Sequence, residues 1–348
     1  MLLFDATRRS QKKVCVVAAR EKLSVNDSIE TVRALIEEDM RAVDIIIRSR
    51  LWSDVVLIRQ VAEYIIAGGG KRLRPAVLML VAKALSYSGT VHHELAAVVE
   101  FIHTATLLHD DVVDESALRR GRSTSNAEFG NAASVLVGDF LYSRAFQMMV
   151  SVDDIHVLKV LADATNVIAE GEVLQLLNVH NADVTVDAYL EVVRRKTAKL
   201  FEASGRLGAI IAGSDRQSEE AFAAYGVHLG TAFQLIDDVL DYSGDERETG
   251  KSVGDDLSEG KPTLPLIFAM QRCSPADAEL VRNAIKHGGR EDLPAVLEAV
   301  RACGALEYTR EQARIAASRA RDAIDSIRHS NYRQALLDLT TFAVERSF

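Results

Sequence analysis

The chain has 348 residues, and 48% of them are apolar, which is ample for a sizeable hydrophobic core. Its 50 acidic and 41 basic residues give a net charge of −9, which argues against a surface built to hold a nucleic-acid backbone. The three cysteines, at positions 15, 273 and 303, are spaced neither as a zinc site nor as a disulfide framework. A reducing compartment suits them, so we expect a cytoplasmic protein that binds no nucleic acid.

The N-terminal segment contains a short apolar run, residues 14–19, after four basic residues. This run is too short for the core of a secretory signal, and the acidic Asp5 and Glu21 weaken the alternative of a mitochondrial presequence. We expect residues 1–27 to form a loosely ordered extension and residues 28–348 to fold as one domain. No apolar run approaches the roughly 20 residues needed to span a bilayer, so no transmembrane segment is expected.

Long helices are predicted for the middle of the chain, because residues 76–261 contain no proline. Apolar residues recur there at steps of three and four, as at Leu95, Val98 and Ile102, which is a helical period. Clusters of Gly, Ser and Asn mark the expected joins between helices near residues 86–90, 121–126, 212–215 and 242–256. The sequence therefore predicts an all-α, single-domain bundle of ten or more mostly antiparallel helices.

A glycine-rich stretch with three basic residues, GGGKRLRP, occupies residues 68–75. Its glycines let the backbone approach a ligand closely, and Lys71, Arg72 and Arg74 can bind phosphate groups. The spacing is not that of a Walker loop. A helix-ending glycine turn with surface charge is the alternative interpretation.

The stretch DDVVD at residues 110–114 places carboxylates along one helix face. At 100° per residue, Asp110 and Asp114 lie one turn apart on nearly the same face, with His103 two turns earlier, whereas Asp111 points to the side. The pattern returns as DDVLD at residues 237–241, without any fixed repeat around it. Two matching sites on two helices are therefore expected.

The two carboxylate motifs require a counter-charge, because like charges one turn apart destabilise a helix and the apolar neighbours indicate partial burial. A single copy could be a solvated helix face, but two copies flanked by Leu, Val, Ile and Phe favour a divalent cation. Mg²⁺ binds carboxylates, waters and substrate phosphates. Basic residues that could hold such phosphates follow the motifs, namely Arg119, Arg120, Lys196, Lys251 and Lys261.

These motifs, in this order, resemble the trans-isoprenyl (polyprenyl) diphosphate synthase family, and within it the bacterial octaprenyl diphosphate synthases. The matching pieces are GGGKRLRP, EFIHTATLLHDDVVDES, LRRG, NAASVLVGDF, AEGEVLQL, KTAKLF, GTAFQLIDDVLDY and GKSVGDDLSEGKPTLPL. The resemblance runs from about residue 28 to the end. It implies the isoprenoid synthase fold, a helical bundle around a central active-site cavity, with residues 28–348 as the catalytic domain.

The resemblance also implies a role for each motif residue. The magnesium ligands, for three Mg²⁺ ions per active site, would be Asp110, Asp111, Asp114, Asp237, Asp238 and Asp241. The residues that bind the allylic diphosphate would be Arg119, Lys196, Thr197, Gln234, Lys251 and Lys261, with Thr197 and Gln234 near the developing cation. The residues that bind isopentenyl diphosphate would be Lys71, Arg74, His103 and Arg120.

The implied reaction elongates an allylic diphosphate, with farnesyl diphosphate as the expected primer, by successive isopentenyl diphosphate units. In this family the released diphosphate takes the proton, so no protein base is needed, and the product would supply a quinone side chain. The resemblance further implies a homodimer built through the long central helices, and it allows transient membrane contact for product release.

Product length is expected to depend on Ala105 and Thr106. Short-chain members of the family place bulky aromatic residues at these positions, the fifth and fourth before the first aspartate. Neither residue here can block a tunnel, so we expect a long product, first of 40 carbons, with 45 or 50 carbons or a shorter geranylgeranyl-type product as alternatives. Phe146 or Met149 are candidates for a deeper tunnel floor.

Two other classes of protein share parts of this pattern. The pair His109 and Asp110 also matches the core of the metal-dependent HD phosphohydrolases, although that reading leaves the second motif unexplained. A non-catalytic partner subunit would keep the fold but lose carboxylates or basic residues, and none is missing here.

Overall fold

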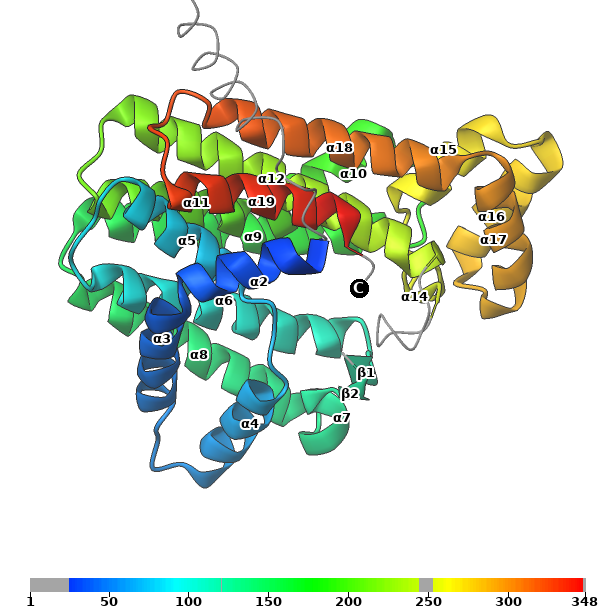
Figure 1. The fold of residues 1–348 in the computed structure, drawn as a ribbon. Helices are drawn as coiled ribbons and strands as arrows, with labels where there is room; N and C mark the ends of the chain where they lie inside the picture. Colours follow the sequence, from blue (N-terminus) through cyan, green and yellow to red (C-terminus); the bar gives the residue numbers. More distant parts are fainter. Residues whose placement is uncertain (1–24, 120, 244–252, 347–348) are drawn as a thin grey trace, which may run out of the picture.

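The computed structural model of this chain describes residues 25–119, 121–243 and 253–346, and these residues are almost entirely helical (Figure 1). Strands occur among them only as a two-residue antiparallel pair, β1 (Leu118–Arg119) and β2 (Arg122–Ser123). The prediction of an all-α bundle of ten or more helices is therefore confirmed. None of the helices in the described parts of the chain is long and apolar enough to cross a membrane.

The first half of the chain forms the helices on either side of the first carboxylate motif. In order they are α2 (Val25–Leu35), α3 (Glu37–Arg50), α4 (Val56–Ala67), α5 (Leu73–Ala84), α6 (Val91–Val113), α7 (Ser125–Phe129), α8 (Asn131–Ser151) and α9 (Ile155–Asn178). The predicted N-terminal extension lies mostly outside the described residues, and its last three residues already belong to α2. Packing explains why α2 is ordered in this region, because its residues Ile29 and Val32 are buried in the main core.

The second half contains the second carboxylate motif and a smaller group of C-terminal helices. Its elements are α10 (Val186–Val192), the π-helical turn η1 (Val193–Ala198), α11 (Lys199–Ile211), α12 (Arg216–Ser243), α14 (Asp255–Ser258), α15 (Leu264–Arg272), α16 (Pro275–His287), the short 3₁₀ turn η2 (Arg290–Asp292), α17 (Leu293–Ala302), α18 (Ala305–Ala323) and α19 (Asn331–Glu345).

Proline placement accounts for the difference between long and short helices. The proline-free span holds α6, α9 and α12, with 23, 24 and 28 residues. Three of the remaining prolines, Pro265, Pro275 and Pro294, stand in the first turns of α15, α16 and α17, where the missing N–H removes no helical hydrogen bond.

Helices α11 and α12 approach so closely that their backbones touch. A Cβ added at Gly205 would overlap the carbonyl oxygen of Phe222, and one added at Gly226 would overlap that of Phe201. Glycine is therefore required on both helices at this crossing. The contact brings η1, which directly precedes α11, next to the second carboxylate motif on α12.

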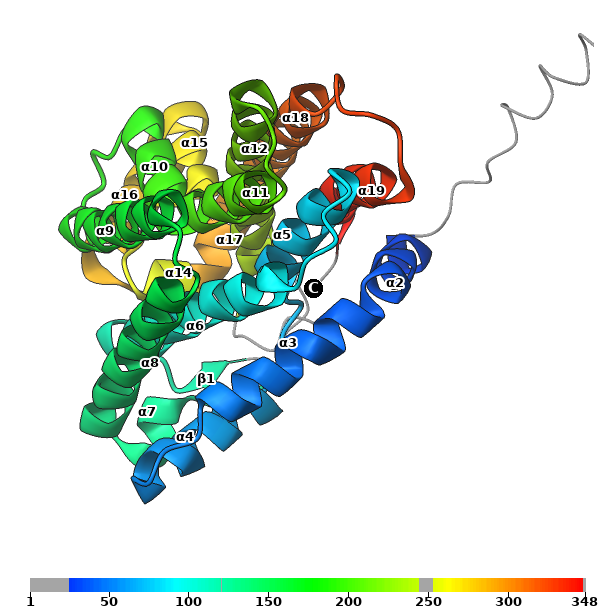
Figure 2. The same ribbon diagram turned by 90° about the vertical axis from the view of Figure 1, so that its left-hand side faces the viewer.

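The two largest apolar clusters among the described residues surround this arrangement. The main core joins α2 to α9 with α11, α12 and α19, and a second cluster is formed mostly by α15, α16, α17 and the start of α18. Figure 2 shows α6 below α11 and α12, and Figure 1 shows the ends of α6 and α12 on the same side as the β1–β2 pair and α14. Both carboxylate motifs lie at these ends.

Candidate active site

A cavity of about 890 Å³ lies between α6, α9, η1 and α12, and the start of α5 and the segment from α14 to α15 complete its wall. Both carboxylate motifs contribute to its lining. They stand in the last turns of α6 and α12, where the unpaired carbonyl groups already carry partial negative charge. The helix ends and the carboxylates therefore reinforce one another, and the part of the cavity at these two helix ends favours cations.

The carboxylates of the first motif face two ways. Asp110 and Asp114 line the cavity, as helical spacing predicts. Asp111 is 4% exposed and accepts from Arg119, whose Nε and Nη2 atoms lie 2.8 and 2.6 Å from its Oδ1. Burial raises the pKa of Asp111, and the Arg119 guanidinium only partly opposes this shift.

The second motif shows the same division. Asp237 and Asp241 line the cavity. Asp238 also borders it but is 1% exposed, and both of its oxygens are engaged, Oδ1 by Gln234 Nε2 at 2.9 Å and Oδ2 by the Tyr189 hydroxyl. Burial, reinforced by nearby carboxylates, raises the pKa of Asp238 to about 8. Tyr189 had no predicted role.

Basic side chains supply the counter-charge that the sequence requires. Lys261 Nζ lies 2.7 Å from Asp114 Oδ2, and Lys196 Nζ lies 3.4 Å from Asp110 Oδ2. Burial lowers the pKa of each lysine, but the surrounding carboxylates outweigh it, and both pKa values are raised. Both lysines therefore stay protonated in the cavity.

Arg346 supplies a further counter-charge that sequence reasoning missed. Its Nη2 atom lies 2.5 Å from Asp237 Oδ1 and donates to the Phe233 carbonyl at 2.8 Å. The guanidinium also stacks 3.8 Å from the centre of the Phe233 ring. The sequence offers no signal for this contact, because Arg346 follows α19 and lies more than a hundred residues from Asp237.

Three of the residues predicted to bind isopentenyl diphosphate, Lys71, Arg74 and His103, line the same cavity. Aromatic rings support the first two, since Lys71 Nζ lies 5.8 Å from the Phe342 ring centre and Arg74 Cζ lies 4.5 Å from that of Phe201. Such contacts hold cations without neutralising them. Two further predicted residues, Arg120 and Lys251, lie outside the described residues.

The π-helical turn η1 presents Lys196 and Thr197 to the cavity. Thr197 Oγ1 donates to Gln234 Oε1 at 2.9 Å, and Gln234 in turn holds Asp238. The wider π turn is typical of functional positions in helices. Helical periodicity alone did not reveal it.

Two more residues that the sequence did not assign, Glu172 and Gln175, reach the cavity from α9. Both accept from Lys196 Nζ, at 2.5 and 2.6 Å. Burial raises the pKa of Glu172 to about 7 despite the lysine. Their segment, AEGEVLQL, is one of the pieces that carry the family resemblance. That resemblance was the signal in the sequence that could have identified these two residues as part of the site.

The predicted chain-length residues differ in position. Thr106 lines the cavity, whereas Ala105 is 0% exposed, packs in the main core and does not line the cavity formed by the described residues. Phe146 is 40% exposed and Met149 is buried, and neither borders this cavity. Their predicted role as the floor of a product tunnel therefore gains no support from the cavity that the described residues form.

His109 turns away from the cavity. Its Nε2 atom lies 3.1 Å from the Val135 carbonyl oxygen and 3.5 Å from Asp139 Oδ1, both on α8. A Cβ added at Gly138 would overlap its ring. His109 and Asp110 therefore do not form a joint metal site.

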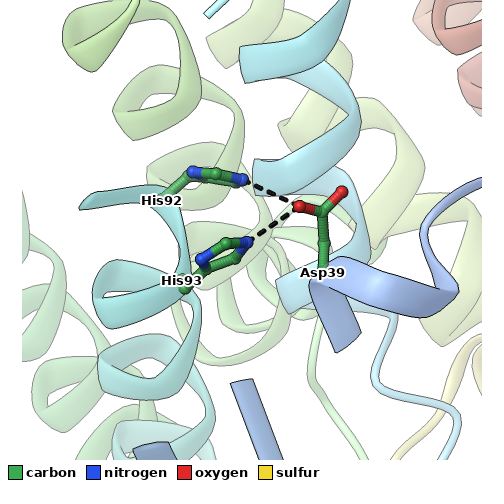
Figure 3. A group of neighbouring side chains, drawn as sticks. All are labelled: Asp39, His92 and His93. Atoms are coloured by element: carbon green, nitrogen blue, oxygen red, sulfur yellow. Dashed lines mark hydrogen bonds and ion pairs between the residues drawn. The ribbon is translucent and has the colours of Figure 1, made fainter. Parts of the chain in front are cut away.

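A separate polar cluster joins α3, α5 and α6 at the opposite end of α6 (Figure 3). Asp39 Oδ1 lies 3.2 Å from His92 Nε2, 2.8 Å from His93 Nε2 and 3.3 Å from Lys83 Nζ. The three potential metal-ligand atoms lie within 4.8 Å of one another. Lys83 already provides the positive charge for this carboxylate, so we interpret the cluster as a link between helices.

Comparison with known proteins agrees with this geometry. The sequence model of the polyprenyl synthetase family matches residues 55–302. The chain is 53% identical over 320 residues to octaprenyl diphosphate synthase of Escherichia coli (strain K12), covering 92% of this chain and 99% of that protein. It is 50% identical over 322 residues to octaprenyl diphosphate synthase of Haemophilus influenzae, covering 92% and 98%.

Solved structures show the same fold. A polyprenyl synthase from Caulobacter crescentus, complexed with calcium and isoprenyl diphosphate, is 44% identical, with a TM-score of 0.90 over 95% of this chain and 100% of that one. A decaprenyl diphosphate synthase from Rhodobacter capsulatus is 43% identical, with a TM-score of 0.86 over 92% and 99%. The chain therefore belongs to the polyprenyl synthetase family and is a prenyltransferase.

Proposed function

We propose that this enzyme elongates farnesyl diphosphate with isopentenyl diphosphate units to all-trans octaprenyl diphosphate, which supplies a quinone side chain. The observation that carries the proposal is the meeting of two carboxylate motifs and two sets of basic residues in one cavity. The octaprenyl synthases among its relatives support a product of 40 carbons. A nonaprenyl synthase from Rhodobacter capsulatus, 44% identical, keeps longer products as the alternative.

The carboxylates that line the cavity suit Mg²⁺. Asp110, Asp114, Asp237 and Asp241 offer hard oxygen donors from two helix ends that face one space. We propose that they hold three Mg²⁺ ions, which would supply positive charge to the diphosphate as it leaves. The other two aspartates of the motifs are engaged by protein donors, so we assign them to holding the motifs in place.

The basic residues would bind the two substrates. Lys196, Lys261 and Arg119, with Lys251, would hold the allylic diphosphate beside the carboxylates and stabilise negative charge on its oxygens. Lys71, Arg74 and His103, with Arg120, would hold isopentenyl diphosphate in the same cavity. The double bond of one substrate would then face the reacting carbon of the other.

Thr197 and Gln234 would orient oxygen atoms toward the developing allylic cation. Their mutual hydrogen bond fixes both side chains at the cavity wall. The departing diphosphate would take the proton, held in place by the lysines. The cavity wall then needs no protein base for the proton.

Two alternatives are disfavoured. An HD-type phosphohydrolase would need His109 beside Asp110 in a metal site, and His109 instead contacts α8. A non-catalytic subunit would be expected to lack charged motif residues, and five of the six motif aspartates line the cavity together with basic residues.

We also propose a homodimer of cytoplasmic chains, each with one catalytic domain over residues 28–348. Exposed apolar side chains gather on α8 and α9, which lie on the same side of the molecule in Figure 2. They are Leu136, Phe146 and Val150 of α8 and Val173, Leu176 and Leu177 of α9. Such a surface is typical of a subunit interface. Transient membrane contact would serve release of the apolar product.

Mass spectrometry of products made by the purified chain from farnesyl diphosphate, isopentenyl diphosphate and Mg²⁺ tests the function. Octaprenyl diphosphate is the expected main product. Phosphate or diphosphate release that does not depend on isopentenyl diphosphate would instead indicate a hydrolase. A chain that is inactive alone but active with another subunit would indicate the partner role.

A further inference from the structure

The segment AEGEVLQL on α9 has no role in the site as proposed so far. We propose that three of its residues, Gly171, Glu172 and Gln175, are positioning residues that hold the Lys196 ammonium group for the allylic diphosphate. The inference rests on the proposed role of Lys196 at that diphosphate. It adds α9 to the elements that determine how the allylic substrate is bound.

The first support is the close approach of α9 to η1. A Cβ added at Gly171 would lie 2.7 Å from the backbone nitrogen of Lys196 and 2.8 Å from Arg195 Cβ. No side chain fits this space without moving the π turn. Gly171 therefore lets the backbone that bears Lys196 rest directly on α9.

The second support is the pair of acceptors that meet the lysine. Glu172 Oε2 and Gln175 Oε1 lie 2.5 and 2.6 Å from Lys196 Nζ, whereas Asp110 Oδ2 lies farther away, at 3.4 Å. Glu172 and Gln175 are three residues apart, so one face of α9 presents both acceptors. Lysine is otherwise a flexible point charge with three donors.

The consequence concerns Asp110. If α9 did not hold the ammonium group, Lys196 would be drawn onto the Asp110 carboxylate, the only aspartate of the two carboxylate motifs within 4 Å of it among the described residues. That contact would compete for the carboxylate and withdraw the lysine from the diphosphate. Hydrogen bonds from Lys196 Nζ to the two α9 acceptors leave the Asp110 carboxylate available to cations and keep the ammonium group available to the diphosphate.

The chain offers a matched control on the same two elements. Glu170 Oε2 lies 2.6 Å from Arg195 Nη1, which is also a contact from α9 to η1. This pair is largely exposed and does not line the cavity. Loss of Glu170 therefore removes a bridge between α9 and η1 without touching Lys196.

The experiment compares Glu172→Leu, Gln175→Leu and Glu170→Leu in the full-length enzyme, with KM for each substrate and kcat as readouts. Glu172→Leu and Gln175→Leu should each raise the KM for the allylic substrate about tenfold, with the KM for isopentenyl diphosphate within about twofold of wild type. Glu172→Gln and Gln175→Glu, which restore an acceptor, should recover part of the loss. Glu170→Leu should change neither KM.

A double-mutant cycle with Lys196→Gln tests whether Glu172 acts through the lysine. In the Lys196→Gln background, Glu172→Leu should raise the allylic KM by less than about twofold. An undiminished effect in that background, or an equal rise in both KM values, would overturn the inference. Thermal unfolding of each variant shows whether the fold is retained.

The cycle also separates this inference from the proposed function. Suppose that Lys196→Gln raises the KM for the allylic substrate while Glu172→Leu and Gln175→Leu leave that KM unchanged. This result refutes only the positioning role. An unchanged allylic KM in Lys196→Gln refutes the proposed role of Lys196, and the positioning role with it.

Discussion

The six aspartates of the two motifs are not equivalent residues. In the first motif Asp110 and Asp114 line the cavity while Arg119 holds Asp111, and the second motif repeats this division. Asp111 and Asp238 are buried and held by protein donors, which leaves them little capacity for cations, whereas the other four aspartates are partly exposed in the cavity. We therefore expect two roles within each DDxxD motif, cation binding by the exposed aspartates and support of the motif by the buried one.

Removing an aspartate that lines the cavity should abolish turnover without unfolding the protein. Asp110→Ala and Asp237→Ala are each expected to lower kcat by orders of magnitude while circular dichroism still shows the helical fold, because each loss also removes repulsion at a helix end. Asp163→Ala, an exposed position on α9, is the matched control. A variant that keeps more than about a tenth of the wild-type rate, a loss below about 1.4 kcal/mol, would contradict the assignment.

The basic residues at the start of α5 should act on one substrate only. Lys71→Ala is expected to raise the KM for isopentenyl diphosphate tenfold or more, because a charge-assisted contact to phosphate contributes roughly 1.5 to 3 kcal/mol. The KM for the allylic substrate should change far less. Steady-state kinetics with each substrate varied in turn measure this difference, and equal changes would show that the two pockets are wrongly assigned.

At the scale of the element, two adjacent residues of α6 face different surroundings, the cavity and the main core. Thr106 lies one turn before Asp110 and lines the cavity, whereas the adjacent Ala105 is enclosed by the main core. A helix turns by 100° per residue, so neighbours in sequence face different surroundings. Product length should therefore respond to position 106.

A bulky residue at position 106 should shorten the product. Thr106→Phe is expected to shift products toward about 15 to 20 carbons, because the ring would stand about 6 Å along the helix from Asp110. Mass spectrometry of the products measures the shift. Full-length product from this variant would show that the growing chain does not pass Thr106.

The companion variant Ala105→Tyr separates the two positions. It should destabilise the fold by about 1 to 3 kcal/mol through overpacking of the core. A lower melting temperature is the expected sign. A stable Ala105→Tyr enzyme with short products would mean that the tunnel passes this residue instead.

At the scale of the whole molecule, the cluster in Figure 3 links helices from the end of α6 farthest from the cavity. Burial and the neighbouring His93 lower the pKa of His92 below 6.5, and Asp39 only partly opposes this shift. Burial raises the pKa of Asp39, but its hydrogen bonds from His93 and His92 and the charge of Lys83 outweigh burial and bring it below 3.8. Both shifts make the fold sensitive to acid.

Stability should therefore fall as pH falls. Below about pH 6.5 the unfolded chain protonates His92 while the folded chain does not, so stability is lost from that pH down to the lowered folded pKa. The contribution of Asp39 is present above pH 3.8 and is lost as pH falls through its own lowered value. The unfolding free energy of His92→Gln should drop less than that of wild type between about pH 7 and pH 5. An equal drop would contradict this, and His156→Gln, an exposed histidine, is the control.

A charged side chain introduced into the proposed subunit interface should separate the dimer into monomers. Leu177→Glu, at a position 72% exposed on α9, should convert the dimer to a monomer, because a buried unpaired carboxylate strongly disfavours association. Light scattering after size-exclusion chromatography measures the mass. Val56→Glu, which changes a similarly exposed apolar residue on α4, should leave the mass at twice that of one chain. A monomeric wild type would disprove the dimer itself.

The sequence by itself determined the helical fold and the two carboxylate faces, because both follow from local spacing. A period of 3.6 residues and the absence of proline decide where long helices run, and a step of four residues places Asp110 and Asp114 on one face. Lys196, Thr197 and Gln234 were found through short motifs that resemble a known family.

Only the tertiary structure decided which partners those residues meet. Arg346 reaches Asp237 from the end of α19, Glu172 and Gln175 reach Lys196 from α9, and contacts of this kind depend on packing between distant segments. The same holds for the glycine contacts that press α11 against α12, because a clash with a carbonyl oxygen exists only once the two backbones lie together. Local spacing determines which face a side chain takes, and only packing determines what that face meets.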